Sequence, residues 1–188
     1  AGILPAANAS DGGGSIRIPA AMCGLVGLKP SRGRISQGPR EEWGFSCQHV
    51  VSHTVRDTAA ILDTSAIPFL GDGVVAPDHG RPYAGCVDAD PGRLRIGLMP
   101  DNHRNETHPD CEAATRRTAD LLADLGHEVV ESRPEAFLQL GDLKELAWAF
   151  TVNWSAGAVV SLLTLGDQLG RTVTADDVEP GTWAMAQR

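Results

Sequence analysis

Residues that could take part in catalysis lie together near the start of this 188-residue sequence. Three consecutive glycines, Gly12, Gly13 and Gly14, lead directly into Ser15. Glycine adopts backbone conformations that other residues avoid, and a run of such residues can turn successive N–H groups toward one anion. A serine hydroxyl beside such donors could attack a carbonyl group while the N–H groups stabilise the oxyanion. Ser15 is therefore the candidate nucleophile, and the N–H groups of Gly12, Gly13, Gly14 and Ser15 are the candidate oxyanion hole.

A flexible turn is the alternative interpretation of this glycine run, and by composition alone it is the commoner one. The residues that follow argue against a linker, because residues 16–30 are apolar and punctuated by glycine. That pattern indicates a buried segment packed closely against other backbone. Other catalytic motifs do not fit: no nucleophile elbow, phosphate-binding loop or dinucleotide fingerprint has its required order of residues.

The segments around the glycines must hold them in place. Residues 6–10 are small and polar, which suits a loop or a short strand leading into the turn. Residues 19–22 suit a short helix, since proline is favoured in a first helical turn, and the glycines after it prevent a longer one. Residues 37–53 are predicted to form a loop. A helix capped by Thr54 should then run to about residue 66, with these residues on its buried face: Val55, Ala59, Ile61 and Leu62.

The second half of the chain has an α/β pattern. A strand is expected over residues 94–99, an amphipathic helix over 109–125 and a second strand over 127–132. Strand, helix and strand in this order suggest a right-handed crossover between parallel strands. Residues 135–165 predict one or two helices that are apolar on several sides and are therefore expected to be buried.

Two segments of the sequence resemble the amidase signature family. The first runs from Ser10 to Pro19 and continues through residues 23–34, and the second is residues 51–57, whose usual Gly-Pro start is replaced here. The resemblance implies an α/β fold with a mixed β-sheet covered by helices. It also implies hydrolysis of carboxamides by a Ser–Ser–Lys triad, with Ser15 as nucleophile.

The resemblance also suggests residues that support the turn. Asp11 and Arg17 flank the glycines and would form an ion pair that holds the glycine backbone. The alternative is that both lie at the surface without contact. Ser10 would hydrogen-bond near the second serine of the triad. Trp43 and Phe45 could line a substrate pocket, or could belong to an ordinary surface loop.

The other two triad members have no counterpart in this sequence. In the family, a lysine and a serine in a cis peptide bond lie farther upstream than the fourteen residues before Ser15. Lys29 and Lys144 do not occupy the position of the catalytic lysine. We therefore expect a single-domain fragment that lacks N-terminal and C-terminal portions and is inactive alone. Its expected parts are a signature segment at 1–36, a loop and helix at 37–92, and an α/β continuation at 93–188.

Composition limits the partners and the location. A net charge of −8 argues against nucleic acid or an anionic membrane surface as a partner, and no apolar run is expected to approach the length of a membrane span. The four cysteines share no short spacing, which indicates free thiols in the cytoplasm rather than a metal site. We expect no cofactor and no metal, and a small-molecule amide as substrate. A homodimer joined through open sheet edges is a further possibility.

Two other functions are compatible with these residues. The chain could belong to a binding or scaffold domain that keeps the pocket without the chemistry. It could also belong to an amidotransferase subunit, which would need partner chains and a route for ammonia.

Overall fold

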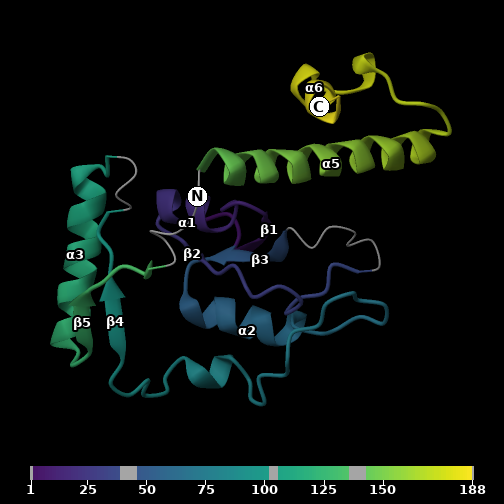
Figure 1. Cartoon of the computed structure of the whole chain (residues 1–188). Helices are drawn as coiled ribbons and strands as arrows, with labels where there is room; N and C mark the ends of the chain where they lie inside the picture. The colour runs from purple at the N-terminus through teal and green to yellow at the C-terminus, as the bar shows by residue number, and fades with distance from the viewer. Residues whose placement is uncertain (1, 39–45, 102–105, 136–142, 188) are drawn as a thin grey trace. The chain divides into compact units, whose positions relative to one another are not determined.

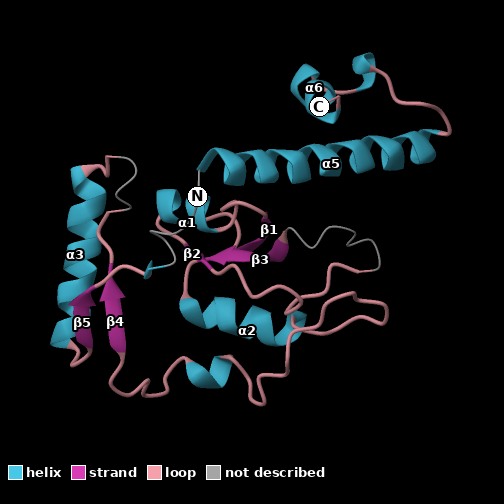
Figure 2. Cartoon of the chain, in the orientation of Figure 1, coloured by secondary structure: helices cyan, strands magenta, loops and turns pink. Residues whose placement is uncertain are grey.

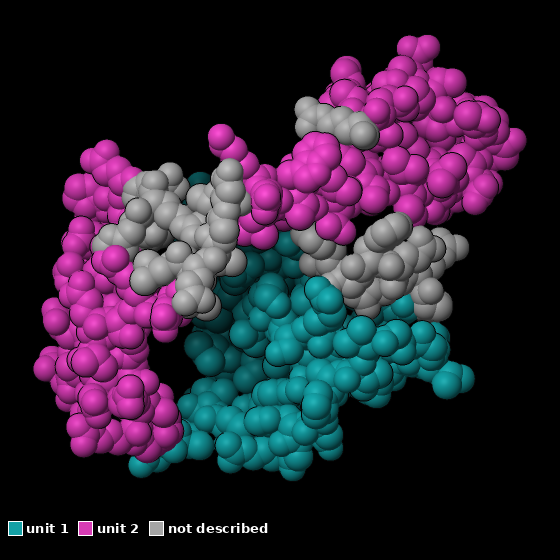
Figure 3. Space-filling view, viewed as in Figure 1, with its two compact units in different colours: residues 1–90 teal, residues 91–188 magenta. Residues whose placement is uncertain are grey.

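The computed structural model describes residues 2–38, 46–101, 106–135 and 143–187. The chain divides into two compact units, 1–90 and 91–188 (Figure 3). The boundary between the units lies two residues before residue 92, where the α/β part of the chain was expected to begin. That the chain forms a single domain remains a prediction. Both units combine helices with strands (Figure 2), in agreement with the expected α/β class.

A three-stranded antiparallel sheet organises unit 1 (Figure 1). Its strands are β1 (Ala6–Asp11), β2 (Val26–Gly27) and β3 (Cys47–Ser52), in the order β1-β3-β2. The register runs from Ala6 opposite Ser52 to Asp11 opposite Cys47. The loop predicted over residues 37–53 was wrong for β3, which is the central strand. Pairing on both edges satisfies the β3 backbone, so a sequence with little apolar alternation still forms a strand.

Two helices accompany this sheet. Helix α1 (Arg17–Cys23) is short, as expected, and ends at Gly24, whose φ of 64° suits glycine. Helix α2 (Val55–Ser65) is capped as predicted, because the Thr54 hydroxyl accepts a hydrogen bond from the Asp57 N–H at 3.0 Å.

The buried face of α2 differs in part from the predicted one. Ala59 and Leu62 are buried as predicted, but Val55 is 59% exposed. Thr58 is buried instead, and its hydroxyl lies 2.7 Å from the Ser52 hydroxyl of β3. A hydrogen bond to the sheet therefore places a polar residue at the interface.

Unit 2 begins with the predicted strand–helix–strand motif. Strands β4 (Arg95–Leu98) and β5 (Glu128–Glu131) pair in parallel, and α3 (Pro109–Asp124) connects them and packs against β5. The parallel crossover is thus confirmed. A 3-10 turn at Ala84–Cys86 lies in unit 1, and another at Ala175–Asp177 in unit 2 precedes the short helix α6 (Pro180–Ala186).

Helix α5 (Leu143–Leu169) contradicts two expectations. Burial was predicted, yet Trp148 is 67% and Leu163 65% exposed; among the described elements of unit 2, α6 is the one that packs most on this helix. Residues 146–166 contain no charged side chain. By length and composition alone the helix could cross a membrane, so the expectation that no run approaches that length was wrong.

Gly27 provides a test of how tightly α1 is held. A Cβ at this position of β2 would lie 2.6 Å from the Ala20 Cβ of α1 and 2.9 Å from the Ile16 carbonyl oxygen. We expect Gly27→Ala to lower the free energy of unfolding by about 1–3 kcal/mol, because backbone and a buried methyl group must shift. Denaturant titration measures the change. Gly97→Ala in β4 is the matched control, since its Cβ would meet only the Ser132 Cβ at 3.7 Å; an equal loss in both variants would contradict the packing argument.

Candidate active site

The glycine turn connects β1 to α1 (Figure 1). Asp11 ends the strand, and Ser15 lies two residues before the helix begins at Arg17. Ser15 is exposed, and no described residue forms a hydrogen bond with its hydroxyl group. Gly14 has a φ of 128°, which is open to glycine but strained for other residues. The turn therefore presents an uncommitted hydroxyl group at its outer side.

Hydrogen bonds to the buried Asp11 carboxylate fix the backbone of this turn. Its side chain is fully buried and forms a two-pronged ion pair with Arg17, with Nε 2.9 Å from Oδ2 and Nη2 3.0 Å from Oδ1. The same carboxylate accepts hydrogen bonds from the N–H groups of Gly14 at 2.6 Å, Ile16 at 3.3 Å and Arg17 at 3.4 Å. The expected ion pair is present, and the surface alternative is excluded. One buried carboxylate thus joins the strand end, the turn and the start of the helix.

The charge state of Asp11 follows from these contacts. The Arg17 guanidinium lowers the pKa of the Asp11 carboxyl far below its usual range, and the three N–H donors lower it further. Burial alone would raise this pKa, but it is outweighed. Asp11 is therefore an anion at neutral pH, as a group that accepts from five donors must be.

The structure changes one part of the predicted oxyanion hole. The Gly14 N–H donates to Asp11 and is therefore committed to holding the turn. The N–H groups of Gly12, Gly13 and Ser15 have no acceptor among the described residues. Those three remain the candidate donors, and their role stays a prediction.

His49 is a buried polar residue of β3 that sequence reasoning missed. It lies opposite Ala9, two residues along from the Asp11–Cys47 pair, so its side chain shares the sheet face of Asp11. It is 2% exposed, and neither ring nitrogen forms a hydrogen bond of normal geometry with a described residue. Burial lowers the pKa of the His49 ring, and the nearby Leu28 backbone offsets only part of this effect. A lone histidine in a segment predicted as a loop carried no signal for burial.

The lowered pKa of His49 makes stability depend on pH. Below about pH 6.5 the His49 ring binds a proton more readily in the unfolded chain than in the folded chain. The folded chain therefore has its full stability above that pH and becomes less stable as the pH falls. We expect a loss on the order of 1 kcal/mol between pH 7 and pH 5, measured by denaturant unfolding. His49→Leu should flatten this dependence, whereas His53→Leu, at an exposed position four residues later, should leave it. An unchanged slope in His49→Leu would contradict the assignment.

The remaining predicted residues are placed as follows. Ser10 is exposed on β1, and its hydroxyl has no hydrogen bond to any described residue. Trp43 and Phe45 lie outside the described residues. The Lys29 ammonium donates to the Pro30 carbonyl at 2.6 Å and lies 3.6 Å from the Cys47 sulfur, so its contacts are not with Ser15. Within the described ranges, no cluster of three or more His, Cys, Asp and Glu residues could hold a metal ion.

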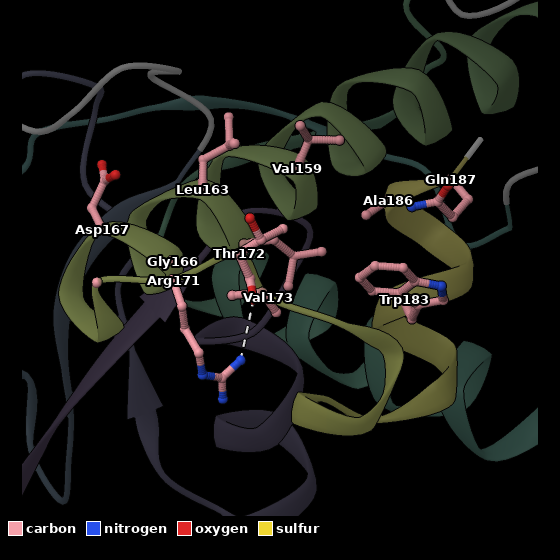
Figure 4. A pocket seen from close by; sticks show the side chains of 12 residues that line it. Val159, Leu163, Gly166, Asp167, Arg171, Thr172, Val173, Trp183, Ala186 and Gln187 are labelled. Carbon is pink, nitrogen blue, oxygen red and sulfur yellow. Dashed lines mark hydrogen bonds between the residues drawn. The ribbon is translucent and has the colours of Figure 1, made fainter.

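A pocket of about 520 Å³ lies in unit 2, between the C-terminal half of α5 and α6 (Figure 4). Apolar side chains such as Val159, Leu163 and Trp183 line much of it. Arg171 at its edge donates to the Thr172 carbonyl and is paired with Asp177 at 2.6 Å. The residues that line it contain no serine or cysteine nucleophile, so the pocket gains no catalytic assignment.

Comparison with known proteins shows that this chain, including the glycine turn, is similar to one protein family. Residues 1–172 match the family model described as Amidase. The sequence is 40% identical over its whole length to 6-aminohexanoate-cyclic-dimer hydrolase from Pseudomonas sp. (strain NK87) and likewise 40% identical to that from Paenarthrobacter ureafaciens. The chain spans 39% of the length of each relative.

Solved structures agree with the sequence comparison. The structure of a 6-aminohexanoate cyclic dimer hydrolase complexed with substrate matches 97% of this chain, with a TM-score of 0.86 and 36% identity, over 39% of its own length. A bacterial aryl acylamidase of the amidase signature family matches 98% of this chain and 38% of its own, with a TM-score of 0.81. Its 22% identity shows a shared fold alone.

Proposed function

This chain belongs to the amidase family, and from that premise we propose that the protein containing it hydrolyses a carboxamide C–N bond with Ser15 as the nucleophile. The observation that supports this most directly is the turn itself. The Ser15 hydroxyl is exposed and lies beside three N–H groups that have no acceptor among the described residues. The backbone of this turn is fixed by its hydrogen bonds to the buried Asp11 carboxylate. The flexible-turn alternative does not account for a carboxylate that is buried and saturated with donors.

The geometry suggests the following steps. The Ser15 hydroxyl attacks the amide carbonyl while a base takes its proton, which forms a tetrahedral intermediate. The N–H groups of Gly12, Gly13 and Ser15 stabilise its oxyanion. The proton then passes to the leaving amine, and water hydrolyses the acyl-enzyme by the reverse route. The C–N bond breaks as the amine is protonated, so the mechanism needs one group near Ser15 that first accepts a proton and then donates it.

The described residues supply no base at Ser15. The hydroxyl forms no hydrogen bond with a described residue, and a serine without a base is a weak nucleophile. We therefore propose that the 188-residue chain alone has no turnover. In the complete protein the base would come from chain outside the present sequence.

The substrate class is suggested by the relatives. The names of two of them state that they hydrolyse the cyclic dimer of 6-aminohexanoate, which is an uncharged cyclic amide. We propose a small uncharged amide as substrate here, and this cyclic dimer is the first compound to assay. An aryl amide is the second.

Covalent labelling tests the nucleophile independently of the substrate. A fluorophosphonate probe should modify the complete folded protein at one site, and peptide mass spectrometry should place the label on Ser15. Heat-denatured protein is the control and should remain unlabelled, because activation requires the folded turn and its base. Labelling at another residue, or none in folded protein that hydrolyses an amide, would contradict the proposal.

A further inference from the structure

Lys29 and Cys47 are in contact within unit 1, although they lie eighteen residues apart in the chain. The Lys29 Nζ is 3.6 Å from the Cys47 sulfur and donates to the Pro30 carbonyl at 2.6 Å. A primary amine and a thiol therefore face each other at hydrogen-bond distance. Neither side chain has a role in the proposed hydrolysis, so the pair is available for a different chemistry.

The small sheet of unit 1 brings these two residues together. Cys47 is the first residue of β3 and lies opposite Asp11 of β1, and Lys29 follows β2 by two residues. Strand β2 pairs with β3 through Val26 and Gly27, at the other end of β3. The Lys29 side chain thus makes a second connection between the two segments, at the start of β3. Its flexible stem allows Nζ to move closer to the sulfur, as a covalent bond requires.

The surroundings of Cys47 distinguish it from the other three cysteines. All four thiols are free. Cys47 is buried beside an amine, whereas Cys23 and Cys111 are exposed, and the Cys86 sulfur lies 3.6 Å from the His79 ring. Cys47 is therefore the cysteine whose oxidised form would meet an amine first.

Burial limits what an oxidised Cys47 can react with. Hydrogen peroxide is small, and it converts the thiolate form of a cysteine into a sulfenic acid. A sulfenic acid then condenses with a nearby thiol or nitrogen. Cys47 is 9% exposed, so a large thiol from solution has little access to its sulfur, whereas the Lys29 nitrogen is already in contact.

We propose that Lys29 and Cys47 form a reversible sulfenamide bridge when a peroxide oxidises the protein. First, hydrogen peroxide transfers one oxygen to the Cys47 sulfur, which is oxidised while the peroxide is reduced and leaves as water. The neutral Lys29 amine then attacks this sulfur, so that the S–N bond forms and the S–O bond breaks. The departing hydroxide takes a proton from the nitrogen and leaves as a second water. The bridge joins the start of β3, opposite Asp11, to the segment that follows β2.

Peptide mass spectrometry of the complete protein tests the bridge. Folded protein is treated with hydrogen peroxide, its remaining thiols are blocked with iodoacetamide, and it is digested with trypsin. We expect the tryptic peptides 18–32 and 41–56 to be joined, with a mass equal to their sum less two hydrogens. Fragmentation should place the bond on Lys29 and Cys47, and dithiothreitol should separate the peptides.

A disulfide between Cys23 and Cys47 would join the same peptides with the same mass, so the matched control removes Cys23. Cys23 is exposed at the end of α1, and Cys23→Ser should therefore fold. The joined peptides should persist in Cys23→Ser. In Lys29→Arg their yield should fall at least about tenfold, because a guanidinium stays protonated and offers no nucleophilic nitrogen.

Three results would overturn the inference: loss of the link in Cys23→Ser, an undiminished link in Lys29→Arg, or oxidation of Cys47 to a sulfinic acid without any link. A measurement on unsubstituted protein serves if Lys29→Arg does not fold. Protein unfolded in guanidinium chloride before the peroxide is added should give several-fold less of the Lys29–Cys47 link, and an equal yield would also overturn the inference. None of these measurements uses an amide substrate, so their outcome is independent of the proposed hydrolysis.

Discussion

Replacing Ser15 with alanine is expected to lower kcat/KM for amide hydrolysis by the complete protein by about 10⁴-fold or more, as loss of a catalytic nucleophile does in serine hydrolases. The physical reason is that the Ser15 hydroxyl is exposed and lies beside three N–H groups, those of Gly12, Gly13 and Ser15, that have no acceptor among the described residues. Steady-state hydrolysis of the 6-aminohexanoate cyclic dimer or of an aryl amide provides the measurement.

The same variant should fold normally, and this makes the result specific. Ser15 is exposed and its hydroxyl makes no hydrogen bond to a described residue, so the free energy of unfolding should change by less than about 0.5 kcal/mol. Ser65→Ala is the control, because its hydroxyl bonds only to the Ile61 carbonyl within α2 and should leave activity intact. Activity retained in Ser15→Ala would refute the assignment of the nucleophile.

Replacing Asp11 with asparagine is expected to cost about 1.5–3 kcal/mol of stability, because it removes the buried charged acceptor of several hydrogen bonds, although the Arg17 side chain left behind is 54% exposed. The new NH₂ group would also face a donor, since both carboxylate oxygens accept from Arg17 and from main-chain N–H groups. Where the complete protein still folds, hydrolysis should fall at least about 10²-fold, because the oxyanion donors lose their fixed positions. Denaturant unfolding and steady-state kinetics measure the two effects.

A matched pair elsewhere in unit 1 serves as the control for Asp11→Asn. Arg56 and Asp88 form the same two-pronged contact, at 3.0 and 3.1 Å, but both side chains are exposed. Asp88→Asn should therefore change stability far less than Asp11→Asn does and leave hydrolysis unchanged. If the two variants lost equal stability, burial of Asp11 would not be the cause.

The lowered pKa of Asp11 adds a dependence on pH. A carboxyl group whose pKa is lower in the folded chain contributes stability above its unfolded pKa and loses it as the pH falls toward the folded value. The wild-type protein should therefore lose stability below about pH 4, whereas Asp11→Asn, already destabilised, should lose less over that range. A parallel pH dependence in the two proteins would contradict the assignment.

Local sequence rules predicted the elements whose causes lie within a few residues. The Thr54 cap, the glycine end of α1 and the strand–helix–strand order of unit 2 all depend on neighbours in the chain. The Asp11–Arg17 pair was expected from the family resemblance, and its members are six residues apart and bracket one turn. The burial of Thr58 in place of Val55 was beyond these rules, because it depends on Ser52 of a strand that local patterning assigned to a loop.

The sequence by itself predicted the candidate site: a serine after three glycines, flanked by an aspartate and an arginine that pair across the turn. Tertiary structure alone decided which N–H groups remain free, because the direction of the Gly14 N–H depends on where Asp11 is buried. It also decided that His49 is buried, since β3 becomes central only by pairing with β1, about forty residues earlier. Hydrogen bonds within a turn follow from short-range geometry, whereas burial depends on segments that are distant in the chain, and no local pattern encodes that contact.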